Sequence, residues 1–85
     1  MIPLWTERQE LTVEEDGQGC PRRFYWERRY HSVEQVSRHW RVHLDWWTPR
    51  ELWRDYWEVA TDADLLCVVY HDLAAGGWAL ERIYP

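Results

Sequence analysis

Apolar and polar residues alternate most regularly over residues 38–47. One set of alternate positions holds Trp40, Val42, Leu44 and Trp46. The other set holds His39, Arg41, His43, Asp45 and Trp47. A period of two with one apolar face is typical of a half-buried antiparallel strand. We therefore predict a strand over residues 38–47, with the set that contains Trp40 facing the core.

Shorter segments on both sides also have strand character, and turn residues separate them. The predicted strands cover residues 11–13, 22–26, 29–33, 55–59, 65–70 and 78–84. Residues 33–37 fit either one helical turn or a bent strand, and we favour the strand. Glu27 and Arg28 form a tight turn without the Asn-Gly signal of a standard hairpin. A loop containing Gly76 and Gly77 joins the last two strands into a hairpin.

One short helical turn is predicted near residues 49–53. Thr48-Pro49-Arg50-Glu51 has the order of a capping box, with proline at the first helical position. The chain is thus expected to be mainly β, with six or seven short strands in a small antiparallel SH3-like barrel or meander. Barrel closure is the usual way to cover the edges of such a sheet. We divide the chain into an N-terminal arm, residues 1–10, and a single β domain, residues 11–85.

The length of 85 residues allows one modest core. Residues 1–11 lack the apolar segment of a signal peptide, and no apolar run is long enough to span a membrane. We therefore expect a cytoplasmic protein. Cys20 and Cys67 could pair in principle, but reduced thiols fit that compartment better.

Charge is distributed unevenly along the chain. Residues 1–20 carry a net charge of −4, residues 21–57 carry +3 and residues 58–85 carry −4, which gives the total of −5. A basic middle between acidic ends argues against a dedicated duplex-DNA binder, for which a basic domain is expected. It leaves room for local contact with anions.

The basic middle is also rich in tryptophan. Residues 40–57 hold five of the eight tryptophans: Trp40, Trp46, Trp47, Trp53 and Trp57. A small barrel cannot enclose all of them. Trp46 and Trp47 are adjacent, so in a strand they point to opposite faces and one of them should be exposed. An exposed indole beside arginine can anchor a protein partner or stack on a nucleobase.

The candidate binding residues are the cations of this segment and the indoles expected near them. They are Arg38, His39, Arg41, His43, Trp47, Arg50, Trp53 and Arg54. The alternative is a solvated face on which the arginines pair with Asp45, Glu51 and Asp55. Trp26, Trp40, Val42, Leu44, Trp57 and Trp78 are expected in the core.

No residues form a recognisable catalytic or metal-binding pattern. His39 and His43 would lie about 13 Å apart along a strand, too far for two ligands of one ion. Cys67 lies inside an apolar strand, where a thiol is usually inert. We predict no enzymatic activity, no metal and no cofactor.

The order of aromatic and basic residues resembles a known family. The residues that carry the resemblance are Pro21–Trp26, Arg28–Tyr30, Trp40-Arg41, Trp46-Trp47, Arg54–Trp57 and Gly77–Arg82. They resemble a small uncharacterised bacterial domain. A related version lies at the C-terminus of the catalytically inactive Y-family polymerase homologue of the bacterial mutasome. Trp57, His71 and Glu27 depart from that pattern.

The resemblance implies a role in DNA repair or translesion synthesis through protein assembly. Together with the exposed aromatic surface, it leads to the hypothesis of a non-enzymatic protein-interaction module. The alternative is single-stranded nucleic-acid binding through the arginine, histidine and tryptophan surface.

Overall fold

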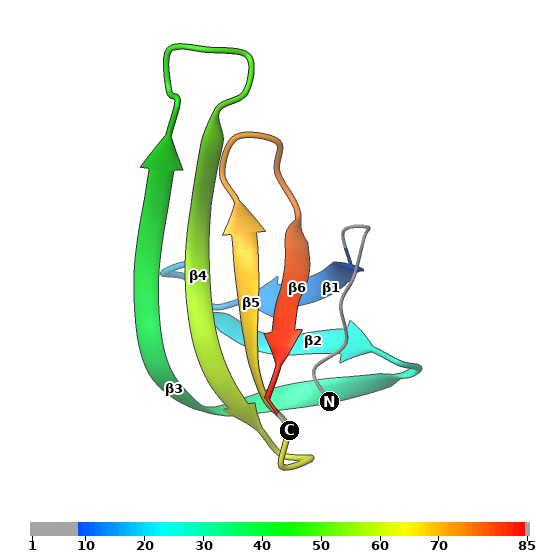
Figure 1. The fold of residues 1–85 in the computed structure, drawn as a ribbon. Coiled ribbons are helices and arrows are strands. Elements are labelled where there is room, and N and C mark those ends of the chain that lie inside the picture. The colour runs from blue at the N-terminus through cyan, green and yellow to red at the C-terminus, as the bar shows by residue number, and fades with distance from the viewer. Residues whose placement is uncertain (1–8, 85) are drawn as a thin grey trace.

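The computed structural model describes residues 9–84, which form six antiparallel strands. They are β1 (Gln9–Glu15), β2 (Pro21–Trp26), β3 (Arg29–Leu44), β4 (Leu52–Thr61), β5 (Leu66–Asp72) and β6 (Trp78–Ile83). Each strand pairs with the next, and β6 pairs back with β1, so the sheet closes into a barrel (Figure 1). The mainly β prediction and the small antiparallel barrel are confirmed. Of the predicted arm, Gln9 and Glu10 belong to β1, and residues 1–8 lie outside the described residues.

β3 is a long bent strand that belongs to both halves of the barrel. Arg29–Ser32 pairs with β2, and the strand from Val33 onward pairs with β4. The register shifts between Val33 and Gln35 and again between Val36 and Arg38. Such bulges bend a strand and increase its twist. The bent strand favoured for residues 33–37 is thus confirmed, and Figure 1 shows β3 turning from the base of the barrel into the upright sheet.

The connection between β3 and β4 differs from the prediction. β3 ends at Leu44, because Asp45 adopts a left-handed backbone conformation with φ of 53°. The Thr48 N–H then donates to the Asp45 carbonyl (3.0 Å), and the Glu51 N–H donates to the Thr48 carbonyl (3.3 Å). These bonds make two consecutive turns, and β4 already begins at Leu52. The predicted strand was therefore wrong over residues 45–47.

The predicted capping box does not form, and no helix is present among the described residues. The Thr48 hydroxyl accepts from the Arg50 N–H (3.1 Å) instead of the Glu51 N–H. The Glu51 carboxylate contacts His43 at 2.7 Å instead of reaching back to Thr48. His43 of β3 thus takes the Glu51 carboxylate that a capping box would need, which is consistent with the absence of a helix here.

Two layers of apolar side chains hold the upright sheet. The barrel interior contains Phe24, Trp57, Val59, Cys67, Val69, Trp78 and Leu80. The outer face of the sheet carries a second cluster, Tyr56, Val68, Tyr70 and Ala79, against which Trp40, Val42 and Tyr84 pack. Because successive side chains of a strand point to opposite faces, Tyr56 and Trp57 belong to different layers. The expected core positions of Trp57 and Trp78 are confirmed, and Trp26 packs against the same interior cluster. The prediction that the Trp40 face of β3 points into the barrel was wrong, because Trp40 and Val42 pack on the outer cluster, half-buried. Leu44, 56% exposed, was also wrongly placed in the core.

The two cysteines are free and differ in burial. Burial raises the pKa of the Cys67 thiol to about 12, and it also raises the pKa of the half-buried Cys20. We predict that iodoacetamide alkylates Cys20 slowly in the native domain and leaves Cys67 unmodified. Peptide mass spectrometry should find label on Cys67 only after unfolding in denaturant. Native labelling of Cys67 at the rate of Cys20 would contradict its place in the core.

Candidate interaction surface

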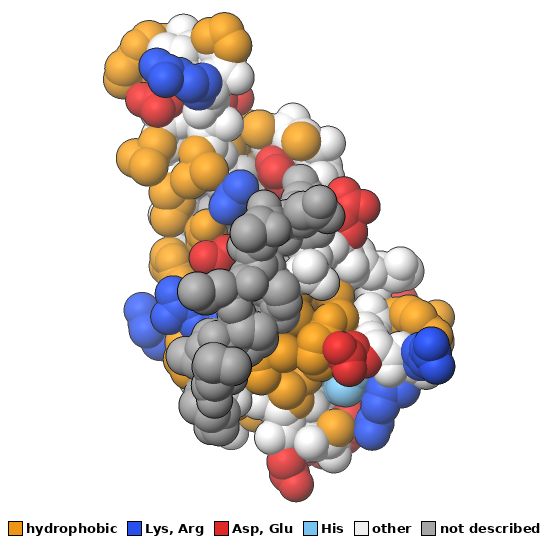
Figure 2. Space-filling view, turned by 45° about the vertical axis from the view of Figure 1, so that its right-hand side comes forward, with side chains coloured by type: hydrophobic (Ala, Val, Ile, Leu, Met, Phe, Trp, Pro, Cys, Tyr) orange, Lys and Arg blue, Asp and Glu red, His pale blue; other side chains and the backbone are white. Residues whose placement is uncertain are grey.

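The β3–β4 hairpin extends beyond the body of the barrel and ends in an apolar tip. We define the hairpin tip as Leu44–Glu51. Trp46 is 65% exposed and Trp47 is 69% exposed. The two indoles contact each other edge to face, with ring centroids 5.3 Å apart. Figure 2 shows this end of the molecule projecting from the barrel, with hydrophobic side chains around a basic one. The prediction that one of the pair is exposed was too conservative, since both are.

The inner face of the hairpin continues the barrel interior and is built around Asp55. In the β3–β4 register, Arg41 lies opposite Asp55 and His39 lies opposite Trp57. The Asp55 carboxylate accepts from His39 Nε2 (2.8 Å) and from the Arg41 guanidinium (3.2 and 3.3 Å). Burial alone would raise the pKa of this carboxyl. The bonds and charges of Arg41 and His39 outweigh burial and hold the pKa below its ordinary value.

Histidine and tryptophan rings stack along the same face. The His39 and Trp57 centroids lie 3.5 Å apart, with 9° between the ring planes. The His43 ring stacks on Trp53 at 4.7 Å, while its Nε2 contacts Glu51 at 2.7 Å. These histidines therefore already have an aromatic partner and an acidic partner each. The alternative interpretation, in which the arginines pair with nearby acids, is thus confirmed for Arg41 and Asp55, whereas Glu51 pairs with His43 and not with an arginine.

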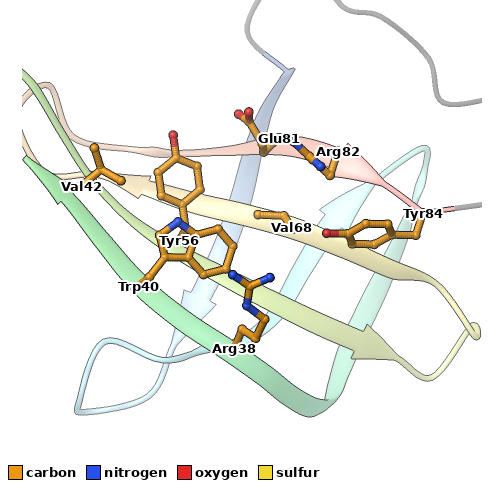
Figure 3. A pocket seen from close by; sticks show the side chains of 8 residues that line it. All are labelled: Arg38, Trp40, Val42, Tyr56, Val68, Glu81, Arg82 and Tyr84. Atoms are coloured by element: carbon orange, nitrogen blue, oxygen red, sulfur yellow. The ribbon is translucent and has the colours of Figure 1, made fainter.

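The outer face of the sheet carries a groove with a volume of about 380 Å³. Its lining is mainly aromatic and basic: Arg38, Trp40, Val42, Tyr56, Val68, Glu81, Arg82 and Tyr84. Figure 3 shows Trp40 and Tyr56 together on one side of Val68 and Tyr84 on the other. The Tyr84 hydroxyl donates to Glu58 (3.0 Å), and the Ser37 hydroxyl donates to the same carboxylate (2.8 Å). The Tyr84 bond ties the residue that follows β6 to β4, the Ser37 bond ties β3 to β4, and both bonds lower the pKa of Glu58.

Two of the aromatic rings that line this groove, Trp40 and Tyr56, already have ring partners. The Arg38 guanidinium lies 4.7 Å from the Trp40 ring centroid, and Tyr56 stacks parallel to Trp40 at 5.3 Å. Outside the groove lining, the Arg54 guanidinium lies 4.3 Å from the Tyr70 centroid. A nucleobase that stacked on Trp40 from the Arg38 side, or between Trp40 and Tyr56, would have to displace these contacts.

The eight predicted binding residues do not form one stripe. His39, Arg41, His43 and Trp53 share the inner face of the hairpin. Arg38 and Arg54 lie on the outer face, and Trp47 and Arg50 lie at the tip. Sequence reasoning left open whether Trp46 or Trp47 is exposed and named only Trp47 as a binding residue. It did not single out Tyr56 and Tyr84 of the groove. The turn-forming residues Asp45 and Thr48-Pro49 were the one sequence signal that β3 ends before Trp46 and that this indole is therefore exposed.

The described residues offer no group of three or more histidine, cysteine, aspartate or glutamate side chains that could hold a metal ion. Each of the four histidines stacks on an aromatic ring: His31 on Phe24, His39 on Trp57, His43 on Trp53 and His71 on Trp78. In residues 9–84 there is likewise no helix with the length and apolarity needed to cross a bilayer.

The fold and its surfaces define a small closed β-barrel domain with a projecting, tryptophan-tipped hairpin. The chain belongs to the family described as a domain of unknown function, DUF6504, whose model matches residues 2–84. No curated protein and no solved structure matches the chain.

Proposed function

We propose that this domain is a non-enzymatic protein-interaction module that contacts its partner through the hairpin tip. The observation that carries the proposal is the exposure of Trp46 and Trp47, 65% and 69%, at the end of a structured extension. Apolar side chains gathered at an exposed site commonly mark an interaction surface. Tryptophan is enriched among the residues that dominate binding energy, and burial of one indole removes roughly 150–250 Å² from water.

The electrostatics of the tip favour a protein over a nucleic acid. Arg50 is the basic residue of Leu44–Glu51, and Asp45 and Glu51 are its acidic residues. Single-stranded nucleic acid is usually held by several cations that follow its phosphates, with aromatic rings between them. Exposed indoles beside Arg50 keep nucleic-acid binding as the second candidate. A cytoplasmic setting in DNA repair or translesion synthesis is part of the proposal and is supported by the resemblance in aromatic order.

Photo-crosslinking from the tip tests the proposal. A benzophenone amino acid at position 50, introduced into the full chain in cells of the source organism, should give one dominant protein adduct. The same probe in the Trp46→Ala, Trp47→Ala variant should lose that adduct. Once the crosslinked partner protein is identified and purified, the double variant should bind it at least about 30-fold more weakly than the unchanged chain does. This is the effect expected for the loss of one or more strong anchors.

Fluorescence titration with oligothymidylate provides the opposing test. Saturable quenching at low salt that fades at moderate salt, with no protein adduct from position 50, would replace the protein-interaction proposal by nucleic-acid binding. The variant Tyr25→Ala, which changes another exposed aromatic residue (42% exposed) far along the chain in β2, is the matched control and should retain the adduct.

A further inference from the structure

The barrel closes, yet the extension of β3 leaves one backbone edge open. β2 pairs with β3 only through Ser32, and β4 pairs with the opposite edge of β3 as far as Leu44. No other strand among residues 9–84 pairs with β3 beyond Ser32. Figure 1 shows this part of β3 at the margin of the upright sheet. The N–H and C=O groups of such an edge can pair with an incoming strand.

The regular part of this edge is Arg38–Leu44, which we call the open edge. Glu34 and Ser37 have no opposite residue in β4, so the bulges at these positions distort the strand before Arg38. From Arg38 to Leu44 every residue has a β4 partner in unbroken register. This length is close to that of an ordinary strand of about 5–6 residues, so it can hold a complete added strand.

The charge of the open edge indicates which kind of strand could pair with it, a second copy of this chain or a segment of another protein. It carries Arg38 and Arg41 and no acidic residue. A second copy paired antiparallel and centred on Arg41 would place the two Arg41 side chains opposite each other. Like charges directly opposite destabilise a strand pair. Asp55 pairs with Arg41 from the β4 side, but the Arg41 side chain remains 57% exposed. An acidic segment is therefore favoured over a second copy.

The two faces of the open edge differ in chemistry. Trp40 and Val42 lie on the outer face, where they are half-buried and line the groove. His39, Arg41 and His43 lie on the inner face. An added strand would place alternate side chains beside each set, because side chains alternate between faces. Its outward side chains would meet Trp40 and Val42, and its inward side chains would meet Arg41.

We propose that the open edge binds an extended segment of a protein partner in which apolar and acidic residues alternate. The apolar residues pack beside Trp40 and Val42, and the acidic residues lie beside Arg41. Main-chain hydrogen bonds supply affinity, and the alternate side chains supply specificity. This inference rests on the proposed role in protein interaction, and it adds a second contact surface with a defined ligand chemistry.

Amide hydrogen exchange followed by NMR tests the inference on the full chain. The probe is a blocked synthetic peptide as long as the open edge, alternating valine and glutamate. Every second amide of Arg38–Leu44 should exchange at least about tenfold more slowly when the peptide is saturating, because only alternate N–H groups face the open edge. A peptide with lysine in place of glutamate should protect these amides much less. N-methylation of the Val/Glu peptide on its pairing residues should abolish protection without any change in the domain.

The outcomes separate this inference from the proposed function. Equal protection by the lysine peptide would overturn the acidic specificity. Protection that appears without peptide and grows with protein concentration would assign the edge to a second copy. Unchanged exchange over Arg38–Leu44 would reject strand addition, while the protein adduct from position 50 would still stand. If the probe at position 50 gives no protein adduct but the peptide protects the amides of Arg38–Leu44, the hairpin tip is not the contact surface and the open edge is.

Discussion

Replacing Trp57 by alanine is expected to lower the free energy of unfolding by about 3–5 kcal/mol, the usual cost of removing a large buried ring. The same substitution at Trp47 is expected to change it by less than about 0.5 kcal/mol. Trp57 is 8% exposed and belongs to the barrel core, and it also supports the His39 ring. Trp47 is 69% exposed at the hairpin tip. The two changes delete the same side chain, so they differ only in the surroundings.

Urea unfolding at neutral pH, followed by circular dichroism, measures both values. A small domain has about 5–15 kcal/mol of stability in total, so Trp57→Ala should shift the midpoint far down or unfold the chain. Leu44→Ala is a second control, because Leu44 is also exposed. A loss of several kcal/mol for Trp47→Ala would place that indole in the core and remove the basis of the proposed contact surface. Near-equal costs at both sites would contradict the two-layer packing.

The strands could be predicted because their signals are local. β3 shows the alternation of apolar and polar residues from Arg38 to Leu44, whereas β2, β5 and β6 are short aromatic or apolar runs bounded by turn residues. The alternation gives a wrong strand end after Leu44. Trp46 continues the apolar spacing of Trp40, Val42 and Leu44, although the backbone already turns at Asp45. A left-handed φ at Asp45 leaves no trace in hydrophobicity. The extent of the hairpin, and with it the exposure of Leu44 and Trp46, therefore could not be read from the pattern.

The sequence allowed the candidate site residues to be chosen, but it did not show which of them lie together in the fold. The alternation correctly placed His39, Arg41 and His43 on one face. Their partners, however, come from β4, and His39 meets Asp55 across sixteen positions of sequence. The capping-box prediction failed for the same reason, since His43 takes the Glu51 carboxylate that the motif assigns to Thr48. The grouping of the site residues and the failure of the capping box both depend on contacts between β3 and β4 or the turn before it. Such contacts can be assigned only once the pairing register of the strands is known.

The aromatic residues have a structural role that composition alone did not reveal. The β3–β4 extension lacks the second sheet layer that covers the lower barrel. His39 on Trp57 and His43 on Trp53 supply packing along its inner face, and Trp40 on Tyr56 supplies it along the outer face. Aromatic cross-strand pairs stabilise such a hairpin by roughly 0.2–1 kcal/mol each. Three of the six indoles of the basic middle thus hold the extension in shape, and Trp46 and Trp47 lie exposed at its end.

Asp55 is the charged centre of this extension, and Asp55→Asn is expected to lower stability by about 1.5–3 kcal/mol, as for hydrogen bonds to charged groups. Asp55 is 8% exposed, and its carboxylate accepts from both His39 and Arg41. The amide keeps the shape but removes the charge and one acceptor oxygen. Asp45→Asn is the matched control, because Asp45 is exposed at the tip and asparagine tolerates its left-handed φ. The control should change stability by less than about 0.5 kcal/mol.

The difference between Asp55→Asn and the unchanged chain should depend on pH in a defined direction. The pKa of Asp55 in the folded domain lies below the ordinary value of 3.8. A carboxyl with a lowered pKa stabilises the folded state fully above its unfolded pKa, and this stabilisation is lost as the pH falls through the folded pKa. Urea unfolding at a series of acidic pH values should therefore show a difference that shrinks as the pH falls below about pH 4. A difference that grows on acidification would mean that the Asp55 carboxyl is destabilised in the fold, and the His39–Asp55–Arg41 arrangement would not hold the extension together.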